Sequence, residues 1–228
     1  MSRQPEDRTP DQVLDDVNEL RVKTRAARPR LSVPLFMVAV LISGAMPLYV
    51  QRPVFSGESS TSNPLGISGL LDLVSPTAAT IYWLIAVPLC VVAVSYYCNR
   101  AGGRSGVRFR VQPWLWSGIV LFVLAVFATR NGLFGFAGNL MIRGLIPLLT
   151  VSVAVLVWGL VLRSVLLSAI GAVAVATSLV SNLYNVENLV PQQYAIDDRY
   201  SLLLNIAVTA SVFLVGALVA VVVERVHR

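Results

Sequence analysis

Six long runs of apolar residues, separated by polar connections, dominate the chain. A bilayer hydrocarbon core about 30 Å thick needs roughly 20 helical residues to cross it, and each run approaches that length. The pattern predicts an all-α fold: a polytopic transmembrane helix bundle over residues 31–228, preceded by a cytoplasmic segment over residues 1–30. The six expected spans cover residues 31–50, 77–97, 112–129, 144–162, 164–183 and 201–223.

The run from Gly144 to Leu183 is too long for one crossing. As a single helix it would extend about 60 Å, twice the hydrocarbon thickness. Arg163 divides it into two parts of about 20 residues, so we predict a tight helical hairpin with Arg163 at its turn. A charge at the bilayer centre costs about 2.5–3.5 kcal/mol, whereas an arginine at a turn reaches lipid phosphates. The alternative is an arginine buried in the membrane with a functional role.

Composition and charge agree with a membrane protein. Hydrophobic residues make up 56% of the chain and charged residues 13%, against about 25% charged residues in soluble domains. With a cytoplasmic N-terminus, fourteen of the eighteen basic residues fall on the cytoplasmic side, as the positive-inside rule requires. Both termini are then expected in the cytoplasm. A five-span arrangement, which moves the C-terminus outside and weakens this bias, is the alternative.

The distribution of basic residues also bears on partners and source. Because it follows the expected topology, the net charge of +6 does not indicate a nucleic-acid partner. Seventeen of the eighteen basic residues are arginine, which is typical of GC-rich bacterial genomes and favours a bacterial inner membrane. Tryptophan prefers the headgroup level, and its positions match the expected span ends. They are Trp83 at an outer end and Trp114, Trp116 and Trp158 at inner ends.

Two cytoplasmic segments are candidates for contacts with lipid or protein partners. Residues 10–27 predict an amphipathic helix with a thin apolar stripe, which either rests on anionic lipid or docks a protein partner. Residues 98–113 are glycine-rich but lack the spacing of a phosphate-binding loop, so we interpret them as a topogenic loop facing lipid. This second segment carries Arg100, Arg104, Arg108 and Arg110.

The expected spans contain packing and polar residues but no ionisable side chain away from their ends. Proton relays and catalytic sites in membranes need such groups, so we expect a protein that is not an enzyme and has no cofactor. The chain has one histidine, and Cys90 and Cys98 lie on one expected helix without metal-ligand spacing, so no metal site is expected. Small residues that permit close helix packing are Ser168, Ala172 and Ala176, and Gly216 with Ala220.

Mid-span polar residues can form hydrogen bonds between helices. They include Ser95, Ser152, Thr177, Asn205 and Thr209. Pro88, inside the second expected span, predicts a kink in that helix.

The leading functional hypothesis is an accessory or scaffolding component of a bacterial inner-membrane complex. In its layout, a cytoplasmic amphipathic helix followed by six spans with both termini inside, the chain is similar to the permease subunits of ABC-2-type exporters. That resemblance implies a transport subunit in which residues 98–113 approach a separate ATPase. A third reading is a channel whose wettable path is lined by the mid-span hydroxyl and amide side chains.

Overall fold

The computed structural model describes residues 13–15, 17, 30–51, 73–104, 145–184 and 197–226. Within these residues the chain is helical, and its extended pairing is a single antiparallel bridge between Gln51 and Leu73. The described α-helices are α2 (Ser32–Ala45), α3 (Pro76–Arg104), α5 (Ile146–Val161), α6 (Val165–Leu183) and α7 (Ser201–Val226), and the 3-10 helices are η2 (Met46–Leu48) and η6 (Asp198–Tyr200).

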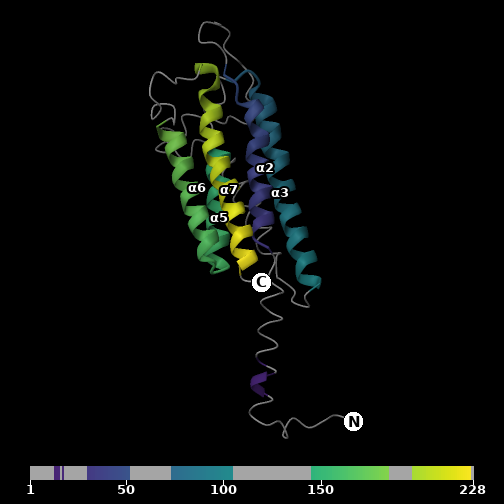
Figure 1. The fold of residues 1–228 in the computed structure, drawn as a ribbon. Coiled ribbons are helices and arrows are strands. Elements are labelled where there is room, and N and C mark those ends of the chain that lie inside the picture. Colours follow the sequence, from purple (N-terminus) through teal and green to yellow (C-terminus); the bar gives the residue numbers. More distant parts are fainter. Residues whose placement is uncertain are drawn as a thin grey trace.

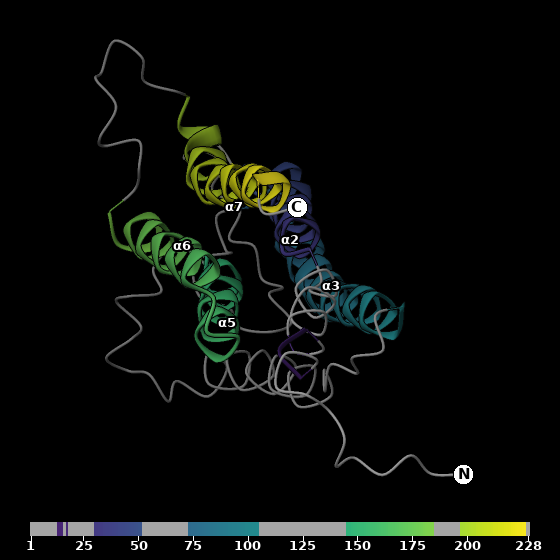
Figure 2. The same ribbon diagram turned by 60° about the horizontal axis from the view of Figure 1, so that its bottom comes forward.

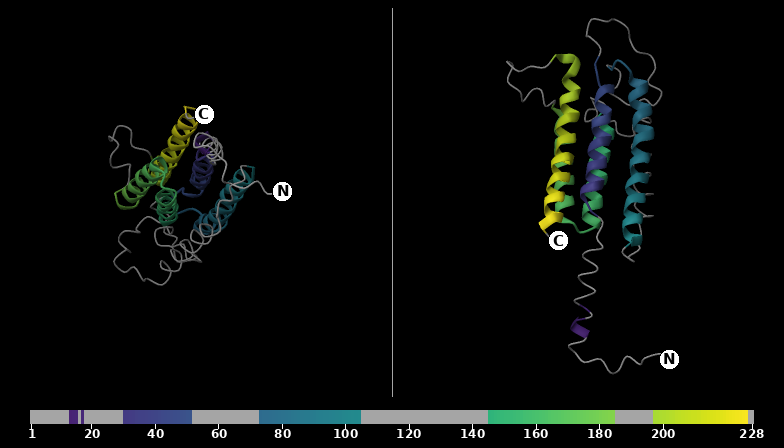
Figure 3. Two further views of the ribbon diagram at one scale, coloured as in Figure 1. Left: turned by 90° about the horizontal axis from the view of Figure 1, so that it is seen from below. Right: turned by 45° about the vertical axis from the view of Figure 1, so that its right-hand side comes forward.

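The five α-helices run side by side as an elongated bundle (Figures 1 and 3). One end, called the turn end below, holds the start of α2, the end of α7 and the turn between α5 and α6. A hydrogen bond between Ser32 and Glu224 joins the first two of these there. The other end, called the bridge end, holds the Gln51–Leu73 bridge, the end of α6 and the start of α7. The direction of the chain therefore alternates between α2 and α3, between α5 and α6, and between α6 and α7.

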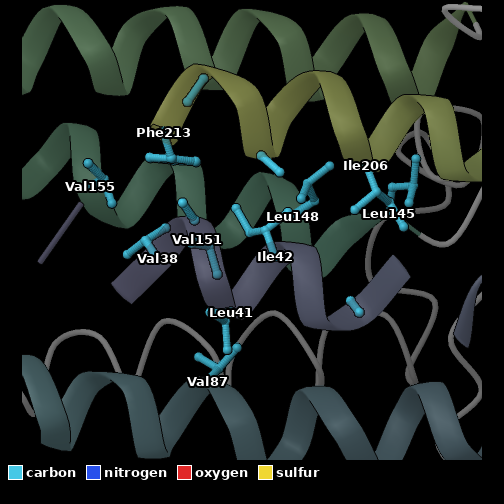
Figure 4. Close-up of a cluster of buried hydrophobic side chains, with 14 of the residues drawn as sticks. Val38, Leu41, Ile42, Val87, Leu145, Leu148, Val151, Val155, Ile206 and Phe213 are labelled. Atoms are coloured by element: carbon cyan, nitrogen blue, oxygen red, sulfur yellow. The ribbon is translucent and has the colours of Figure 1, made fainter. Parts of the chain in front are cut away.

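Seen along their axes, the helices follow one another around an arc in the order α5, α6, α7, α2, α3 (Figure 2). Apolar side chains of α2, α5 and α7 fill the inside of this arc, where Val38 and Ile42 face Leu148 and Val151 while Phe213 approaches from α7 (Figure 4). On the other side of α2, Leu41 meets Val87 of α3. A bundle of apolar helices in lipid gains from such close packing rather than from hydrophobic burial alone.

Three helices are long and apolar enough to cross a membrane: Pro76–Ala101 within α3, Val165–Leu183 and Ser201–Val226. The apolar helices Ser32–Leu48 and Ile146–Val161 are shorter. Helices thus occupy five of the six ranges in which the sequence predicts spans, while the range 112–129 lies outside the described residues. α3 continues to Arg104, beyond the expected end of its span at residue 97.

The turn between α5 and α6 has the form that the hairpin prediction requires. Leu162 closes α5, and Arg163 adopts a positive φ of 51°. The Arg163 amide then donates to Leu160 O and the Ser164 amide to Gly159 O, which is the Schellman pattern of helix termination. Ser164 is also the N-cap of α6, because its hydroxyl oxygen accepts a hydrogen bond from the Leu167 amide.

Only a short part of the expected amphipathic helix over residues 10–27 is described. Residues 13–15 and 17 are helical, and Val13, Leu14 and Val17 are exposed, so these described side chains do not pack on the bundle. The remainder of that range, including its basic half, lies outside the described residues. The amphipathic helix therefore stays a prediction.

Candidate functional site

A seam of buried polar side chains runs through the interface of α5, α6 and α7 in the half of the bundle nearer the bridge end. Its members are serine, threonine and asparagine residues with at most 2% of their surface exposed. They are Ser152 on α5, Ser178, Ser181 and Asn182 on α6, and Asn205 and Thr209 on α7. Polar groups that are buried in an apolar bundle are costly unless hydrogen bonds satisfy them.

The link between α5 and α6 is a chain of three polar side chains. The Ser152 hydroxyl donates to Leu148 O at 2.9 Å, which uses its only proton. In the 2.9 Å contact between the Ser152 and Ser178 hydroxyl groups, Ser178 is therefore the donor. One turn further along α6, the Asn182 amide donates to Ser178 O at 2.9 Å and to Leu145 O at 3.3 Å. Asn182 thus ties the end of α6 to the residue before α5.

The link between α6 and α7 centres on the backbone of Asn205. Its carbonyl oxygen accepts hydrogen bonds from the Ser181 hydroxyl and from the Thr209 hydroxyl, each at 3.4 Å. The Asn205 side-chain amide donates to Ser201 O at 3.3 Å. The Ser201 hydroxyl then donates to the side-chain oxygen of Gln51 at 3.1 Å, and the backbone amide of Gln51 donates to Arg199 O at 3.0 Å. The seam therefore continues to the residues that follow α2.

Four of the five mid-span residues singled out in the sequence divide into two groups, and the fifth, Ser95, is buried on α3. Ser152 does bond across helices, as expected, and Asn205 receives a bond from α6 through its backbone. Thr177 and Thr209 instead bond to carbonyl oxygens of their own helices. Sequence reasoning missed Ser178, Ser181 and Asn182, which recur on one face of α6 at spacings of three and four residues, and that spacing is the signal that could have found them.

Two buried polar atoms have no hydrogen-bond partner in the described part of the chain. They are the side-chain oxygen of Asn182 and the hydroxyl oxygen of Thr80 on α3. The orientation of the Asn182 amide follows from its two carbonyl neighbours, because exchanging its oxygen and nitrogen would set three oxygens against one another. The side-chain oxygen of Asn182 is thus an acceptor that receives no hydrogen bond from the described residues.

A second polar contact lies at the turn end and was not anticipated from the sequence. Glu224, in the last turn of α7, is partly buried and accepts hydrogen bonds from Ser32 through both carboxylate oxygens. The residue before α2 is Leu31, whose side chain cannot cap a helix, so Glu224 supplies the acceptor that the start of α2 lacks. The apolar Leu31 at a helix start is the sequence signal for such a distant cap.

The tryptophans differ in environment. Trp83 is 1% exposed, and its ring nitrogen donates to the Tyr49 hydroxyl at 2.8 Å. Its side chain therefore lies in the protein interior, whereas the sequence predicts a position at the lipid interface. The physical reason is the partner: a buried indole N–H needs an acceptor, and Tyr49 supplies it. Trp158 is half-buried on α5, while Trp114 and Trp116 lie outside the described residues.

The structure describes some, but not all, of the arginines that the sequence predicts to face lipid. Arg163 and Arg100 are both exposed, at the α5–α6 turn and near the end of α3. Arg104 ends α3, whereas Arg108 and Arg110 lie outside the described residues. Cys90 and Cys98 both lie on α3, as expected, and are not joined in a disulfide.

The packing prediction for α6 is wrong in its choice of face. Ala172 and Ala176 are exposed, and α6 instead packs through Leu167, Gly171, Ala174 and Ser178. A Cβ added to Gly171 would lie 2.5 Å from Cα of Leu156, so the backbones of α5 and α6 touch there. Ser168 does take part through its backbone, because a Cβ on Gly159 would lie 2.5 Å from Ser168 N.

On α7 the small residues named from the sequence lie on the buried face of the helix. Gly216 and Ala220 are buried, and a Cβ on Gly216 would meet the side chain of Ile170 at 2.9 Å. The small residues on α7 thus admit the larger side chains of α6. The two outcomes differ because sequence spacing defines a face of small residues but not which neighbour that face meets.

No protein-family model, curated protein or solved structure matches the chain. The described residues also contain no group of three histidine, cysteine, aspartate or glutamate side chains arranged to hold a metal ion. The class of protein is therefore defined by the helices themselves. The described chain is all-helical, and three of its helices are long and apolar enough to cross a membrane, which is compatible with a membrane protein.

Proposed function

We propose that the chain is a six-span bacterial inner-membrane protein, with both termini in the cytoplasm, that serves as an accessory or scaffolding component of a membrane complex. The observation that carries this proposal is the polar seam. Its side chains are hydroxyl and amide groups, which hydrogen-bond helices together and carry no charge at any physiological pH. A seam of this kind suits a rigid bundle that presents surfaces to partners.

The directions of the helices support the six-span topology. α3 ends at the turn end, whereas α5 begins at the bridge end, where Asn182 contacts Leu145. The described residues on either side of positions 105–144 therefore lie at opposite ends of the bundle, and the sequence between them contains the apolar run 112–129 that is assigned to a third span. Two helices shorter than a full crossing, α2 and α5, fit this topology if the bilayer thins locally or the bundle shields their ends.

Orientation can be tested by labelling single cysteines in intact cells. In a background that carries Cys90→Ala and Cys98→Ala, Arg163→Cys should react with a membrane-impermeant maleimide only after the cytoplasm is opened. Tyr184→Cys, at the opposite end of α6, should react in intact cells. The reverse pattern would contradict the orientation, and equal labelling of both positions from one side would contradict the hairpin as a pair of crossings.

The scaffolding role can be tested by photo-crosslinking in the full chain. A photoreactive residue at exposed Val17 or Arg100 should capture one recurring membrane protein, while the same residue at exposed Val222 of α7 serves as the control for random lipid-phase contacts. Capture at Val222 alone, or no recurring partner, would contradict the proposal.

The alternative is a permease subunit of an ABC-2-type exporter. The observation that favours it is the extension of α3 to Arg104, which carries a rigid helix into the segment expected to approach an ATPase. The same experiment separates the two proposals. A recurring partner captured from Arg100 that hydrolyses ATP supports the permease, whereas a partner without ATPase activity supports the scaffold.

A further inference from the structure

Exposed arginines gather at the turn end of the bundle. They come from four different places in the chain: Arg30 before α2, Arg100 on α3, Arg163 in the α5–α6 turn and Arg225 on α7. Within helices α2 to α7 as described, the acid at this end is Glu224, and both of its oxygens accept hydrogen bonds from Ser32. The turn end therefore presents a positive surface with little compensation.

One corner of this surface, between α2 and α3, carries hydrogen-bond donors in addition to positive charge. Arg100 donates to the Tyr96 hydroxyl at 3.0 Å, which leaves the proton of that hydroxyl group available for an acceptor. The Tyr97 hydroxyl lies within the electrostatic reach of the Arg30 guanidinium and also of the Glu224 carboxylate. Tyr96, Tyr97 and Arg100 share one face of α3, because they are three and four residues apart. The corner thus offers two guanidinium groups and phenol hydroxyls.

An apolar track leads along α3 to this corner. Ile85, Leu89, Val92 and Tyr96 are all more than half exposed, and their spacing of four, three and four residues makes one continuous stripe. The stripe ends one turn before Arg100, at the end of the Pro76–Ala101 segment that is apolar enough to cross a membrane. An apolar stripe that ends in arginine and tyrosine matches the shape of a phospholipid, with acyl chains on the stripe and a phosphate at the cations.

We propose that the α2–α3 corner at the turn end binds the headgroup phosphate of an anionic glycerophospholipid, with Arg30 and Arg100 as the charged ligands and the stripe on α3 as the track for an acyl chain. This inference rests on the membrane placement proposed above. The binding site is local: Arg163 and Arg225 lie at the same end but lack the adjoining tyrosine pair, although an exposed apolar stripe on α7 also leads to Arg225. Glu224, at the same end, accepts hydrogen bonds from Ser32 and forms no ion pair with Arg30 in the described part of the chain.

The test is native mass spectrometry of the full chain released from detergent micelles and titrated with phosphatidylglycerol. The wild type should retain phosphatidylglycerol in preference to phosphatidylcholine, and Arg30→Gln/Arg100→Gln should weaken that binding by about fivefold for each arginine. The matched control Arg163→Gln/Arg225→Gln removes the same charge from the same end and should leave the affinity nearly unchanged. All four arginines are exposed, so neither variant is expected to unfold the bundle.

Three results would overturn the proposal. Equal losses in the two double variants would reduce the effect to general surface charge. Equal retention of phosphatidylcholine would show that the headgroup charge does not contribute to binding. Displacement of the lipid by millimolar inorganic phosphate would show that the corner binds free phosphate and not a lipid headgroup. A wild-type chain that cannot be reconstituted into phosphatidylglycerol vesicles would instead contradict the membrane placement itself.

Discussion

The carboxylate of Glu224 accepts hydrogen bonds from the backbone amide and the hydroxyl group of Ser32, at 3.1 and 2.8 Å, across 192 positions of sequence. The last helix thereby caps the first described helix of the bundle at the turn end. α2 has no side-chain cap of its own, so the contact links the stability of α2 to the position of α7. It also lies where residues 1–30 join the bundle.

Glu224→Ala should destabilise the fold by about 1–2 kcal/mol, because the start of α2 loses its charged acceptor. Unfolding in detergent, followed by circular dichroism, would measure the change, and faster amide exchange at Ser32 and Leu35 would locate it. Glu224→Gln keeps one acceptor oxygen and should fall between the wild type and Glu224→Ala. Arg225→Ala, the exposed neighbour, is the control, and a loss as large as that of Glu224→Ala would contradict the capping role.

Arg163→Gly should stabilise the hairpin by about 0.5–1 kcal/mol, because glycine adopts a positive φ without the steric cost of a Cβ atom. The control is Arg163→Ala, which removes the same charge but keeps the Cβ atom. If the alanine variant gained as much stability as the glycine variant, the effect would come from the lost charge and not from the backbone. Midpoints of thermal unfolding in one detergent would compare the three proteins.

Gly171→Leu should destabilise the bundle strongly, by roughly 3 kcal/mol or more, because even a Cβ atom there would lie 2.5 Å from Cα of Leu156. The α5–α6 pair cannot accommodate the side chain without separating. Ala172→Leu, on the exposed face of the same helix, should change stability by less than about 0.5 kcal/mol. The opposite ranking would show that α6 packs through its alanine face after all.

The hydrogen bond between Trp83 and Tyr49 can be measured with a double-mutant cycle. Trp83→Phe and Tyr49→Phe each remove it, and the coupling energy between them should be about 1 kcal/mol for a buried bond of this kind. Trp158→Phe, in the half-buried environment of α5, is the control. A coupling energy near zero would mean that the 2.8 Å contact contributes nothing to stability.

Ser152→Ala and Ser178→Ala should each cost about 0.6 kcal/mol, the average for hydrogen bonds between helices in a membrane bundle. The double variant should cost less than the sum, because either substitution already removes the shared bond. Additive losses would indicate that the two hydroxyl groups act independently. Thr177→Val, whose hydroxyl bonds within its own helix, is the control on α6.

Part of the fold follows from local features that a sequence displays directly. The ranges of α2, α5, α6 and α7 agree with the expected spans within a few residues, because long apolar runs and polar interruptions mark helix bounds in such a chain. The hairpin turn at Arg163 follows in the same way from length alone. The end of α3 was underestimated, because Arg100 and Arg104 interrupt the apolar run without interrupting the helix.

The candidate sites were predicted less well. Small residues on α6 suggested the face that carries Ala172 and Ala176, yet the helix packs through the face that carries Gly171 and Ala174. Tryptophan preference suggested an interface for Trp83, whereas Tyr49 holds it in the interior. In both cases the residue type permits two environments, and the neighbouring helix selects one.

The sequence by itself determined the helical class of this protein, the bounds of most helices and the turn at Arg163, because hydropathy and the φ/ψ preferences of the chain act over one or two turns. Only the tertiary structure decided which faces meet, how Ser178, Ser181 and Asn182 join the polar seam, and that Glu224 caps α2. These contacts join residues up to 192 positions apart. Lipid solvates apolar helices as well as protein does, so hydrophobicity alone does not select their neighbours. The contacts form only in the few arrangements in which the helix backbones touch and the polar groups are paired.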